Sequence, residues 1–261
     1  MNYLFWNTNG KEVNHIIEQI ILDKDCDIIS LAEYKDDIKL LISNLKKAGV
    51  TLFEAPKISS RIDVLSKFKL GKRSLLTDSS YYTILEIPHP TFDRHIVAFV
   101  HLPSKLQSEK GASEEVRFLK EDIEQGEIKQ KHNKTMIIGD FNMNPFEEAM
   151  VSAAALHAVP TKVKASDLKR VVKKREYFMF YNPMWNLMGD FNGSPGSHFY
   201  DKTDYVSYYW HTFDQVVLRK PLFDNLENLQ FLTSVNDMSL TTGKHNKPSI
   251  SDHLPLYFSI T

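Results

Sequence analysis

Several apolar, strand-like runs in this sequence end abruptly in polar residues. The run "YLFW" leads to Asn7, "DIISLA" to Glu33, "IVAFV" to His101 and "TMIIG" to Asp140. A rigid sheet can aim side chains from distant segments at one point, so strand ends are a favoured place for an active site. Asp and Asn are also ordinary turn residues. The polar residues therefore indicate an active site when taken together, whereas any single one of them is weak evidence.

These runs alternate with helical patterns, which indicates an α/β protein. Helices are expected over residues 12–25, over 36–48 before a stop at Gly49, and over 113–131. Asn144 followed by Pro145 predicts the start of another helix that runs to residue 156. Strands are expected at 50–55, 61–68, 79–87, 94–102, 134–142 and 254–260. Residues 160–220 break this rhythm without a shift in composition that would mark a linker, so we expect one domain over 1–261.

Composition and charge restrict the setting in which the chain works. The formal net charge is −1, so a polyanionic partner requires a local basic surface. Cys26 is the only cysteine, which excludes an internal disulfide and argues against a disulfide-linked partner. The first residues are typical of a strand and turn, and no window holds about 18 uncharged apolar residues. We expect a cytoplasmic protein without stable membrane association, and the oligomeric state stays open.

The tetrapeptide GDFN occurs twice, at residues 139–142 and 189–192. The first copy follows a β-branched strand, which predicts that Asp140 is held rigidly and is suited to chemistry. The second copy follows "YNPMWNLM" and precedes "GSPGS", so we expect Asp190 in a turn near the substrate entrance. Similarity around the copies stops within about ten residues, whereas an architectural repeat extends over roughly 20.

Six short motifs occur in one order along the chain: "WNTNG", "LAE", "HLP", "GDFN", "FDQV" and "SDH". In this order they resemble the endonuclease/exonuclease/phosphatase superfamily of metal-dependent phosphoesterases. The motifs run from residue 6 to residue 253, so the resemblance covers nearly the whole chain. It implies an α/β, DNase I-like fold: a four-layer sandwich of two packed mixed or antiparallel β-sheets flanked by helices. It also implies hydrolysis of a phosphate ester by in-line attack of an activated water.

The resemblance assigns a metal side and an attacking side to the site. Glu33 resembles the main Mg²⁺ ligand, a hard carboxylate suited to a hard cation. Asn7 and Asp252 would support the same ion. Asp140 resembles the residue that orients or deprotonates the attacking water, and Asn142 resembles a donor to the phosphoryl group.

Two histidines and an aspartate complete the implied catalytic set. His253 would face the phosphate, and Asp214 would fix its tautomer and favour its charged form. His101 resembles a second histidine that protonates or stabilises the leaving oxygen. Asn9 stands where some branches have Asp, which favours one principal Mg²⁺, with Mn²⁺ as a substitute, and leaves Asn9 as a substrate contact.

The sequence lacks the motifs of zinc enzymes and of P-loop nucleotide-binding proteins. No HExxH sequence and no cysteine pair is present, which argues against a zinc site, and no GxxxxGK[ST] sequence indicates a P-loop. Cys26 has no base next to it in the sequence and is expected as a small core residue.

A basic segment at 161–178, followed by aromatic residues, bears on the substrate. One hypothesis is a strip beside the active site in which Lys173, Lys174 and Arg175 contact phosphates while Tyr181 and Trp185 stack on bases. The alternatives are a solvated face for the basic residues and core packing for the aromatic ones.

Nucleic acid is the favoured substrate, which makes the chain a nuclease. Inositol phosphates, phospholipid head groups and other small phospho-compounds stay open as alternatives, since "FMFYNPMWNLM" could form an apolar, lipid-facing loop. A binding module that lost turnover is the non-enzyme alternative. It would be indicated by loss of one of the following four residues, all of which are present: Glu33, Asp140, Asp214 and His253.

Overall fold

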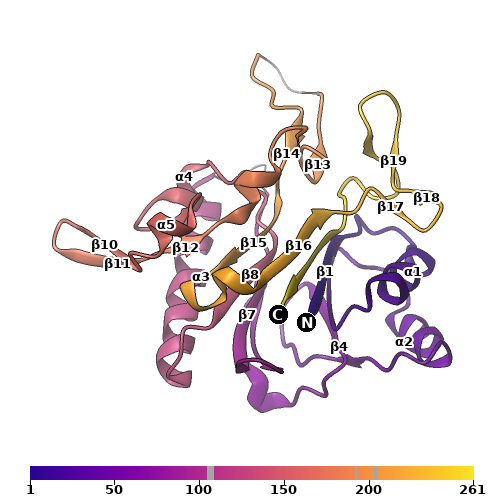
Figure 1. Cartoon of the computed structure of the whole chain (residues 1–261), viewed down its shortest axis with the longest axis horizontal. Helices are drawn as coiled ribbons and strands as arrows, with labels where there is room; N and C mark the ends of the chain where they lie inside the picture. The colour runs from indigo at the N-terminus through magenta and orange to yellow at the C-terminus, as the bar shows by residue number, and fades with distance from the viewer. Residues whose placement is uncertain (105–108, 192, 203–204) are drawn as a thin grey trace.

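Two large β-sheets form the centre of the molecule in the computed structural model, which describes residues 1–104, 109–191, 193–202 and 205–261 (Figure 1). Within these residues one sheet has six strands, in the spatial order β16 (Leu226–Phe231), β21 (Leu256–Ile260), β1 (Asn2–Asn7), β2 (Ile28–Ala32), β4 (Ile62–Ser66) and β3 (Phe53–Glu54). The other has seven, in the order β5 (Leu75–Asp78), β6 (Tyr82–His89), β7 (Asp93–His101), β8 (Thr135–Asp140), β15 (Asp214–Leu218), β12 (Phe180–Tyr181) and β9 (Ala158–Val159). Both sheets are mixed, because β1 runs parallel to β2 and β7 parallel to β8 while most other neighbours are antiparallel.

Alternation along the central strands divides their side chains between two apolar layers. On β7, Val97 and Phe99 join the cluster that lies between the sheets, whereas Ile96 and Ala98 join the cluster beneath α3 (Glu109–Gln130). The strand β8 behaves in the same way, with Ile138 facing the opposite sheet. Every second residue of these strands therefore points into the space between the sheets.

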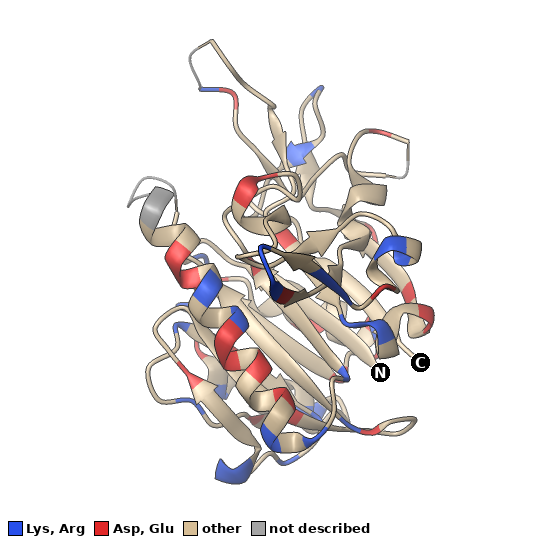
Figure 2. Cartoon of the chain, turned by 90° about the vertical axis from the view of Figure 1, so that its left-hand side faces the viewer, with Lys and Arg blue, Asp and Glu red and all other residues tan. Residues whose placement is uncertain are grey.

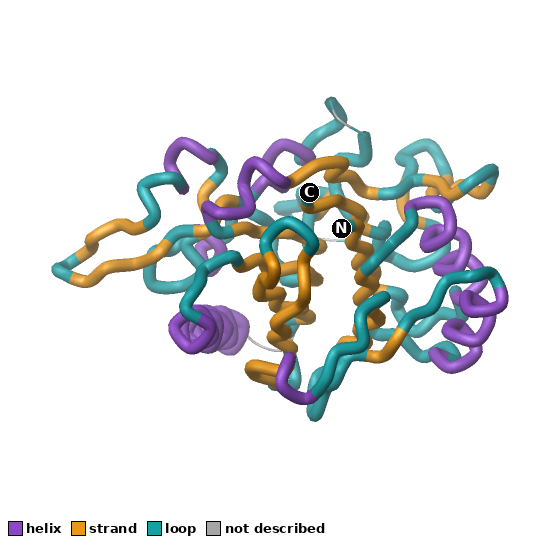
Figure 3. Tube along the Cα trace, turned by 60° about the horizontal axis from the view of Figure 1, so that its bottom comes forward, coloured by secondary structure: helices purple, strands orange, loops and turns teal. Residues whose placement is uncertain are grey.

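Helices cover the outer face of each sheet. The helices α1 (Asn14–Lys24) and α2 (Ile38–Lys47) bury apolar residues at helical spacing against the six-stranded sheet, and α3 does so against the seven-stranded sheet. Figure 3 shows the resulting succession of helix, sheet, sheet and helix. The four-layer α/β sandwich expected from the sequence is confirmed.

The expected helix after Asn144 is mostly wrong. The helix α4 is short (Glu148–Val151), and its N-cap is Glu147 rather than Asn144. The Asn144 side chain is engaged elsewhere, since its Oδ1 accepts a hydrogen bond from the Thr212 N–H at 3.0 Å. Its own N–H donates to Glu147 Oε1 at 2.9 Å, which closes a turn before the helix. The strand expected at 50–55 is likewise reduced to Phe53–Glu54.

Small elements decorate the two sheets, particularly in the irregular region from residue 157 to 211. Three of them are the ribbon of β10 (Lys169–Val172) and β11 (Arg175–Phe178), the ribbon of β13 (His198–Phe199) and β14 (Trp210–His211), and the helix α5 (Lys162–Ala165). The remainder are the 3-10 turns η1 (Lys72–Ser74), η2 (Pro183–Leu187) and η3 (Lys220–Asn225), and the ribbons β17 (Ser234–Val235) with β18 (Met238–Ser239) and β19 (Thr241–Thr242) with β20 (Lys247–Pro248). Cys26 is fully buried in the core. None of the described helices has the length and apolar character to cross a membrane.

Candidate active site

A cavity of about 390 Å³ opens where strands of both sheets end. The alternation of the strands fills this end with polar groups, because Asn7 is the last residue of β1 and Asp140 the last residue of β8. Asp140 follows Ile138 by two residues and therefore shares its inward face. The described side chains that line the cavity are Asn7, Glu33, Arg61, Tyr81, His101, Leu102, Pro103, Ser104, Asp140, Asn142, His198, Phe213, Asp252 and His253.

Asn7 links the two sheets across this cavity. Its Nδ2 donates to Asp140 Oδ2 at 3.0 Å and lies 3.3 Å from Glu33 Oε1. Its Oδ1 accepts the N–H of Asn9 at 3.0 Å, which fixes the orientation of the amide. Asn7 and Asp140 are almost fully buried, whereas 44% of the Glu33 side chain is exposed. One neutral amide thus holds two carboxylates near each other.

Two of the polar residues that follow strands adopt left-handed backbone conformations. Glu33 has φ of 48° and Asn142 has φ of 51°. Asn tolerates this region, but it is uncommon for Glu and costs free energy that the surroundings must offset. The Glu33 carbonyl accepts hydrogen bonds from the Gly10 N–H at 2.9 Å and from Thr8 Oγ1 at 3.1 Å. These contacts hold the turn that points the Glu33 carboxylate at the cavity.

The turn at Asn142 orients the Asp140 carboxylate. The Asn142 N–H donates to Asp140 Oδ1 at 2.8 Å, and its Nδ2 donates to the Leu102 carbonyl at 2.8 Å. Since Leu102 follows His101, the second bond ties the end of β7 to the end of β8. Both oxygens of Asp140 therefore accept a hydrogen bond, and its carboxylate plane is fixed.

His253 and Asp214 form a buried ion pair behind the cavity. His253 Nδ1 lies 2.7 Å from Asp214 Oδ2, and Asp214 pairs with Asp140 across β15 and β8. Burial lowers the pKa of His253, but the Asp214 and Asp140 carboxylates outweigh it and raise that pKa to about 10. Burial raises the pKa of Asp214, and the charge of His253 opposes this shift. The imidazole is consequently a cation at neutral pH.

His101 approaches the same carboxylates from the end of β7. Its Nε2 lies 3.5 Å from Glu33 Oε1 and 3.9 Å from Asp140 Oδ2. The Nε2 of His253 lies 4.0 Å from Asp140 Oδ2. Both distances to Asp140 are too long for hydrogen bonds. Two imidazole rings thus flank one carboxylate without binding it directly, which suits groups that act on a shared substrate.

Comparison with solved structures finds the same architecture. The chain is similar to truncated TDP2 of Caenorhabditis elegans, with a TM-score of 0.59 and 15% identity over 99% of this chain and 96% of that chain. It is also similar to an endonuclease/exonuclease/phosphatase family protein of Leptotrichia buccalis, with a TM-score of 0.57 and 13% identity over 100% and 99% of the two chains. This chain has the endonuclease/exonuclease/phosphatase fold.

A further structure with this fold carries DNA. It is the 3′ phosphatase NExo of Neisseria bound to a product DNA hairpin, with a TM-score of 0.54 and 14% identity over 100% of this chain and 99% of that chain. No protein-family model and no curated protein sequence matches this chain. At these identities the comparisons establish the endonuclease/exonuclease/phosphatase fold, and the chemistry rests on the side chains themselves.

The oxygen donors at the cavity fit a hard divalent cation. Glu33 is half-exposed to the cavity beside the buried Asn7, and exposed Asp252 lines the same space. Mg²⁺ is typically held by one or two carboxylates and keeps several waters. Ligand atoms of Asp140, Asp214 and His253 also lie within 4.8 Å of one another. Since His253 and Asp214 are already bonded to each other, we favour the Glu33 side for an ion.

Several sequence-based site residues lie away from the cavity. Tyr181 is buried in β12, where it pairs with Leu218 and packs against Phe223, so its proposed role as a stacking surface is wrong. Trp185 packs at 6.4 Å from Phe146 and does not line the cavity within the described residues. Asn9 is exposed in the turn after β1 and is likewise not among the described lining residues.

The basic residues expected beside the active site lie elsewhere in the structure. Lys173, Lys174 and Arg175 lie in the β10–β11 ribbon, which joins the seven-stranded sheet through β12. There Tyr181 pairs with Leu218, at the opposite end of β15 from Asp214. They do not lie beside the cavity as expected.

Arg61, Tyr81 and His198 are among the lining residues that the sequence did not indicate. The Arg61 guanidinium lies 5.8 Å from the centre of the Tyr81 ring, and both side chains line the cavity. The His198 ring lies 4.7 Å from that of His253, and its Nδ1 lies 2.9 Å from the Asp252 carbonyl. Burial and the charge of His253 lower the pKa of His198 to about 4, so it is neutral. Arg61 and Tyr81 precede β4 and β6 rather than follow them, so they do not belong to the pattern of polar residues that follow strands.

Proposed function

We propose that this chain is a Mg²⁺-dependent phosphoesterase that hydrolyses phosphodiesters, with nucleic acid as its substrate. The observation that carries the proposal is the convergence of Glu33, Asp140 and the charged His253 on one cavity, although they come from segments far apart in the sequence. A cation facing hydrogen-bonded carboxylates is the arrangement that in-line attack on phosphorus requires.

The metal side of the proposed site consists of Glu33, Asn7 and Asp252. When bound there, Mg²⁺ or its substitute Mn²⁺ would neutralise charge on the phosphate oxygens. Arg61 is the only lysine or arginine among the described lining residues, so the cavity is acidic without an ion. An anionic substrate therefore needs a bound cation as well as His253.

Asp140 is proposed to take a proton from the attacking water. Its carboxylate is held by Asn7 Nδ2 and the Asn142 N–H, so it presents a fixed lone pair to that water. As the water oxygen bonds to phosphorus, the bond to the leaving oxygen breaks. His253 donates from Nε2 to a phosphate oxygen, with Asp214 holding Nδ1, and His101 supplies a proton to the leaving oxygen.

Arg61 and Tyr81 are proposed to contact the substrate beyond the scissile phosphate. A guanidinium can bind a neighbouring phosphate, and the Tyr81 ring offers an aromatic surface on which a base can stack. A nucleic-acid substrate provides both a phosphate and a base. The DNA bound by NExo, which has the same fold, also supports nucleic acid. We expect Arg61→Ala to raise KM for oligonucleotides about 10-fold.

The proposal is tested by metal-dependent turnover. Wild-type protein is incubated with bis-p-nitrophenyl phosphate and Mg²⁺ or Mn²⁺, with and without chelator, beside Glu33→Gln and the exposed control Glu54→Gln. We expect chelator to abolish turnover and Glu33→Gln to lower it at least about 100-fold. Glu54→Gln should behave as wild type. No metal-dependent turnover by the wild type would leave the binding-module alternative.

A substrate panel separates the nuclease from the phosphatase. Labelled single-stranded and duplex DNA, RNA and a set of inositol phosphates are offered to the same preparations. We expect cleavage of a nucleic acid. Consumption of a phosphomonoester alone would reject the nuclease proposal in favour of a phosphatase acting on small phospho-compounds.

A further inference from the structure

The β10–β11 ribbon projects from the body of the molecule (Figures 1 and 3). Its base is connected to the seven-stranded sheet at Leu218, and the cavity side of the same strand begins at Asp214. At a rise of about 3.3 Å per residue these two ends are roughly 13 Å apart. Since none of the ribbon residues is among the described residues that line the cavity, the ribbon does not belong to the site of the proposed hydrolysis.

The charges on the ribbon are distributed unequally between its two faces. Residues directly opposite each other share a face, so Lys169, Val171, Glu176 and Phe178 lie on one face. There Lys169 is neutralised by Glu176, 2.6 Å away. The opposite face carries Arg170 and Arg175, and the tip carries Lys173 and Lys174. Among the described residues, no acidic side chain forms an ion pair with any of these four.

The turn at the tip is conformationally unfavourable for its residues. Lys173 and Lys174 are the two residues between the strands, and both have positive φ, 47° and 65°. A two-residue turn of this kind strongly prefers Asn-Gly, because lysine is disfavoured at positive φ. The chain thus places two lysines at the position where they stabilise the ribbon least and where their ammonium groups project furthest.

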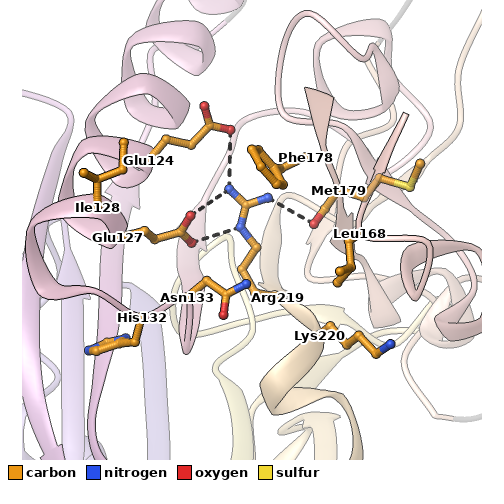
Figure 4. A pocket seen from close by; sticks show the side chains of 10 residues that line it. All are labelled: Glu124, Glu127, Ile128, His132, Asn133, Leu168, Phe178, Met179, Arg219 and Lys220. Carbon is orange, nitrogen blue, oxygen red and sulfur yellow. Dashed lines mark hydrogen bonds and ion pairs between the residues drawn. The ribbon is translucent and has the colours of Figure 1, made fainter. Parts of the chain in front are cut away.

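The base of the ribbon is firmly attached. Buried Arg219 donates from Nη1 to the Met179 carbonyl at 3.1 Å, directly after β11 (Figure 4). Its guanidinium also lies 3.9 Å from the centre of the Phe180 ring. Glu127 on α3 accepts from Nε and Nη2 of the same arginine at 3.0 and 3.2 Å. The basic ribbon is consequently held in a fixed direction by α3 rather than hanging from a loose loop.

We propose that the β10–β11 ribbon is a second nucleic-acid contact, which binds the phosphate backbone of a duplex at a distance from the cavity. This proposal rests on the proposed function of the cavity, because it assigns the same substrate class to both. The major groove admits a two-stranded β-ribbon, and basic side chains on the ribbon reach the phosphates that border the groove. In Figure 2 the ribbon, which also contains Glu176, is marked mainly by basic residues, and α3 carries both signs of charge.

The chemistry of the tip favours nucleic acid over an acidic membrane. A segment that binds a membrane interface buries apolar side chains among the lipids. The tip here consists of Lys173 and Lys174, flanked by Arg175. The exposed apolar residues Val171 and Phe178 lie on the face where Lys169 and Glu176 pair.

The test removes the two tip charges and improves the turn at the same time. In the double variant Lys173→Asn/Lys174→Gly the residues match the turn, so the ribbon stays folded. The matched control is Lys46→Gln/Lys47→Gln, which removes two exposed charges from the end of α2. Binding of each 261-residue protein to a labelled 30-base-pair duplex, and to phosphatidylserine vesicles, is measured in chelator over a range of salt concentrations.

We expect the ribbon variant to bind the duplex about 10-fold more weakly at moderate salt. The magnitude of the negative slope of log K against log salt should decrease by roughly 1.8, because two phosphate contacts are lost. The control should match the wild type. Turnover of bis-p-nitrophenyl phosphate should be unchanged in the ribbon variant, because this substrate is too small to reach the ribbon. Duplex binding within twofold of wild type would overturn the proposal, as would a loss confined to phosphatidylserine vesicles. Binding is measured without turnover, so failure of the ribbon and failure of the catalytic proposal are distinguishable.

Discussion

The two GDFN copies share four letters and almost nothing else. Asp140 is 1% exposed at the end of a central strand, where two hydrogen bonds fix its carboxylate. Asp190 is exposed and lines a separate, polar cavity of about 630 Å³ beside the β17–β18 and β19–β20 ribbons. Phe141 is fully buried, whereas Phe191 is 94% exposed. Asn192 lies outside the described residues.

The difference teaches that the strand before the motif decides where its aspartate lies. In the first copy the alternation of β8 points Asp140 into the space between the sheets, and Phe141 anchors the turn in the core beneath α3. In the second copy the motif follows the 3-10 turn η2 instead of a strand, and its phenylalanine is exposed. Asp190 was expected near the substrate entrance, yet it is not among the described residues that line the candidate active site.

The largest difference between the two copies is expected in the free energy of unfolding when their glycines are replaced by alanine. Gly139 has φ of 149°, and a Cβ there would overlap the Val100 carbonyl oxygen of the adjacent strand. We expect Gly139→Ala to lower the free energy of unfolding by on the order of 5 kcal/mol or more. Gly189 has φ of 83° with no described atom within 4 Å of such a Cβ, so Gly189→Ala should cost about 1 to 2 kcal/mol. Urea unfolding of both variants measures the contrast, and equal losses would reject it.

The second largest difference in the free energy of unfolding is expected between alanine variants of the two phenylalanines. Phe141→Ala removes a fully buried ring and is expected to lower the free energy of unfolding by about 3 to 5 kcal/mol. Phe191→Ala removes an exposed ring and should change it by less than about 0.5 kcal/mol. Thermal or urea unfolding would show the difference. A large loss from Phe191→Ala would mean that the second copy is packed in a way that this structure lacks.

A smaller effect, on turnover, is expected when the Asn142 side-chain amide of the first copy is removed. Asn142→Gly keeps the left-handed turn but removes the hydrogen bond to the Leu102 carbonyl, so His101 and Asp140 lose a common restraint. We expect turnover to fall about 10-fold while the free energy of unfolding changes by less than about 1 kcal/mol. Asn9→Gly, at φ of 49°, is the matched control and should change turnover less than about threefold. A greater loss from Asn9→Gly would restore Asn9 as a substrate contact.

The sequence predicted the parts of the molecule in which local pattern and tertiary packing agree. The apolar runs before Asn7 and Asp140 became central strands, and their polar ends meet at one cavity. The resemblance to the superfamily added the pairing of distant segments, such as the contact of Asp214 with His253, which no local pattern contains.

The remaining errors come from packing that the local pattern does not encode. Tyr181 lies in an aromatic stretch that could stack on a substrate or fill a core, and only the pairing with β15 decides between these. Asn144 has the residue type and neighbours of a helix N-cap, but its side chain is used by Thr212 instead. The ribbon that carries the basic strip was missed because two lysines occupy a turn that usually contains Asn-Gly, so no local turn signal marks it.

The central claim is that the first copy of GDFN performs chemistry and the second does not. The direct measurement is steady-state turnover of bis-p-nitrophenyl phosphate with Mg²⁺ by Asp140→Asn and Asp190→Asn, prepared and assayed together. We expect Asp140→Asn to reduce kcat at least about 1,000-fold with an unchanged fold, and Asp190→Asn to stay within about threefold of wild type. An equal loss from both substitutions, or full activity in Asp140→Asn, would contradict the assignment.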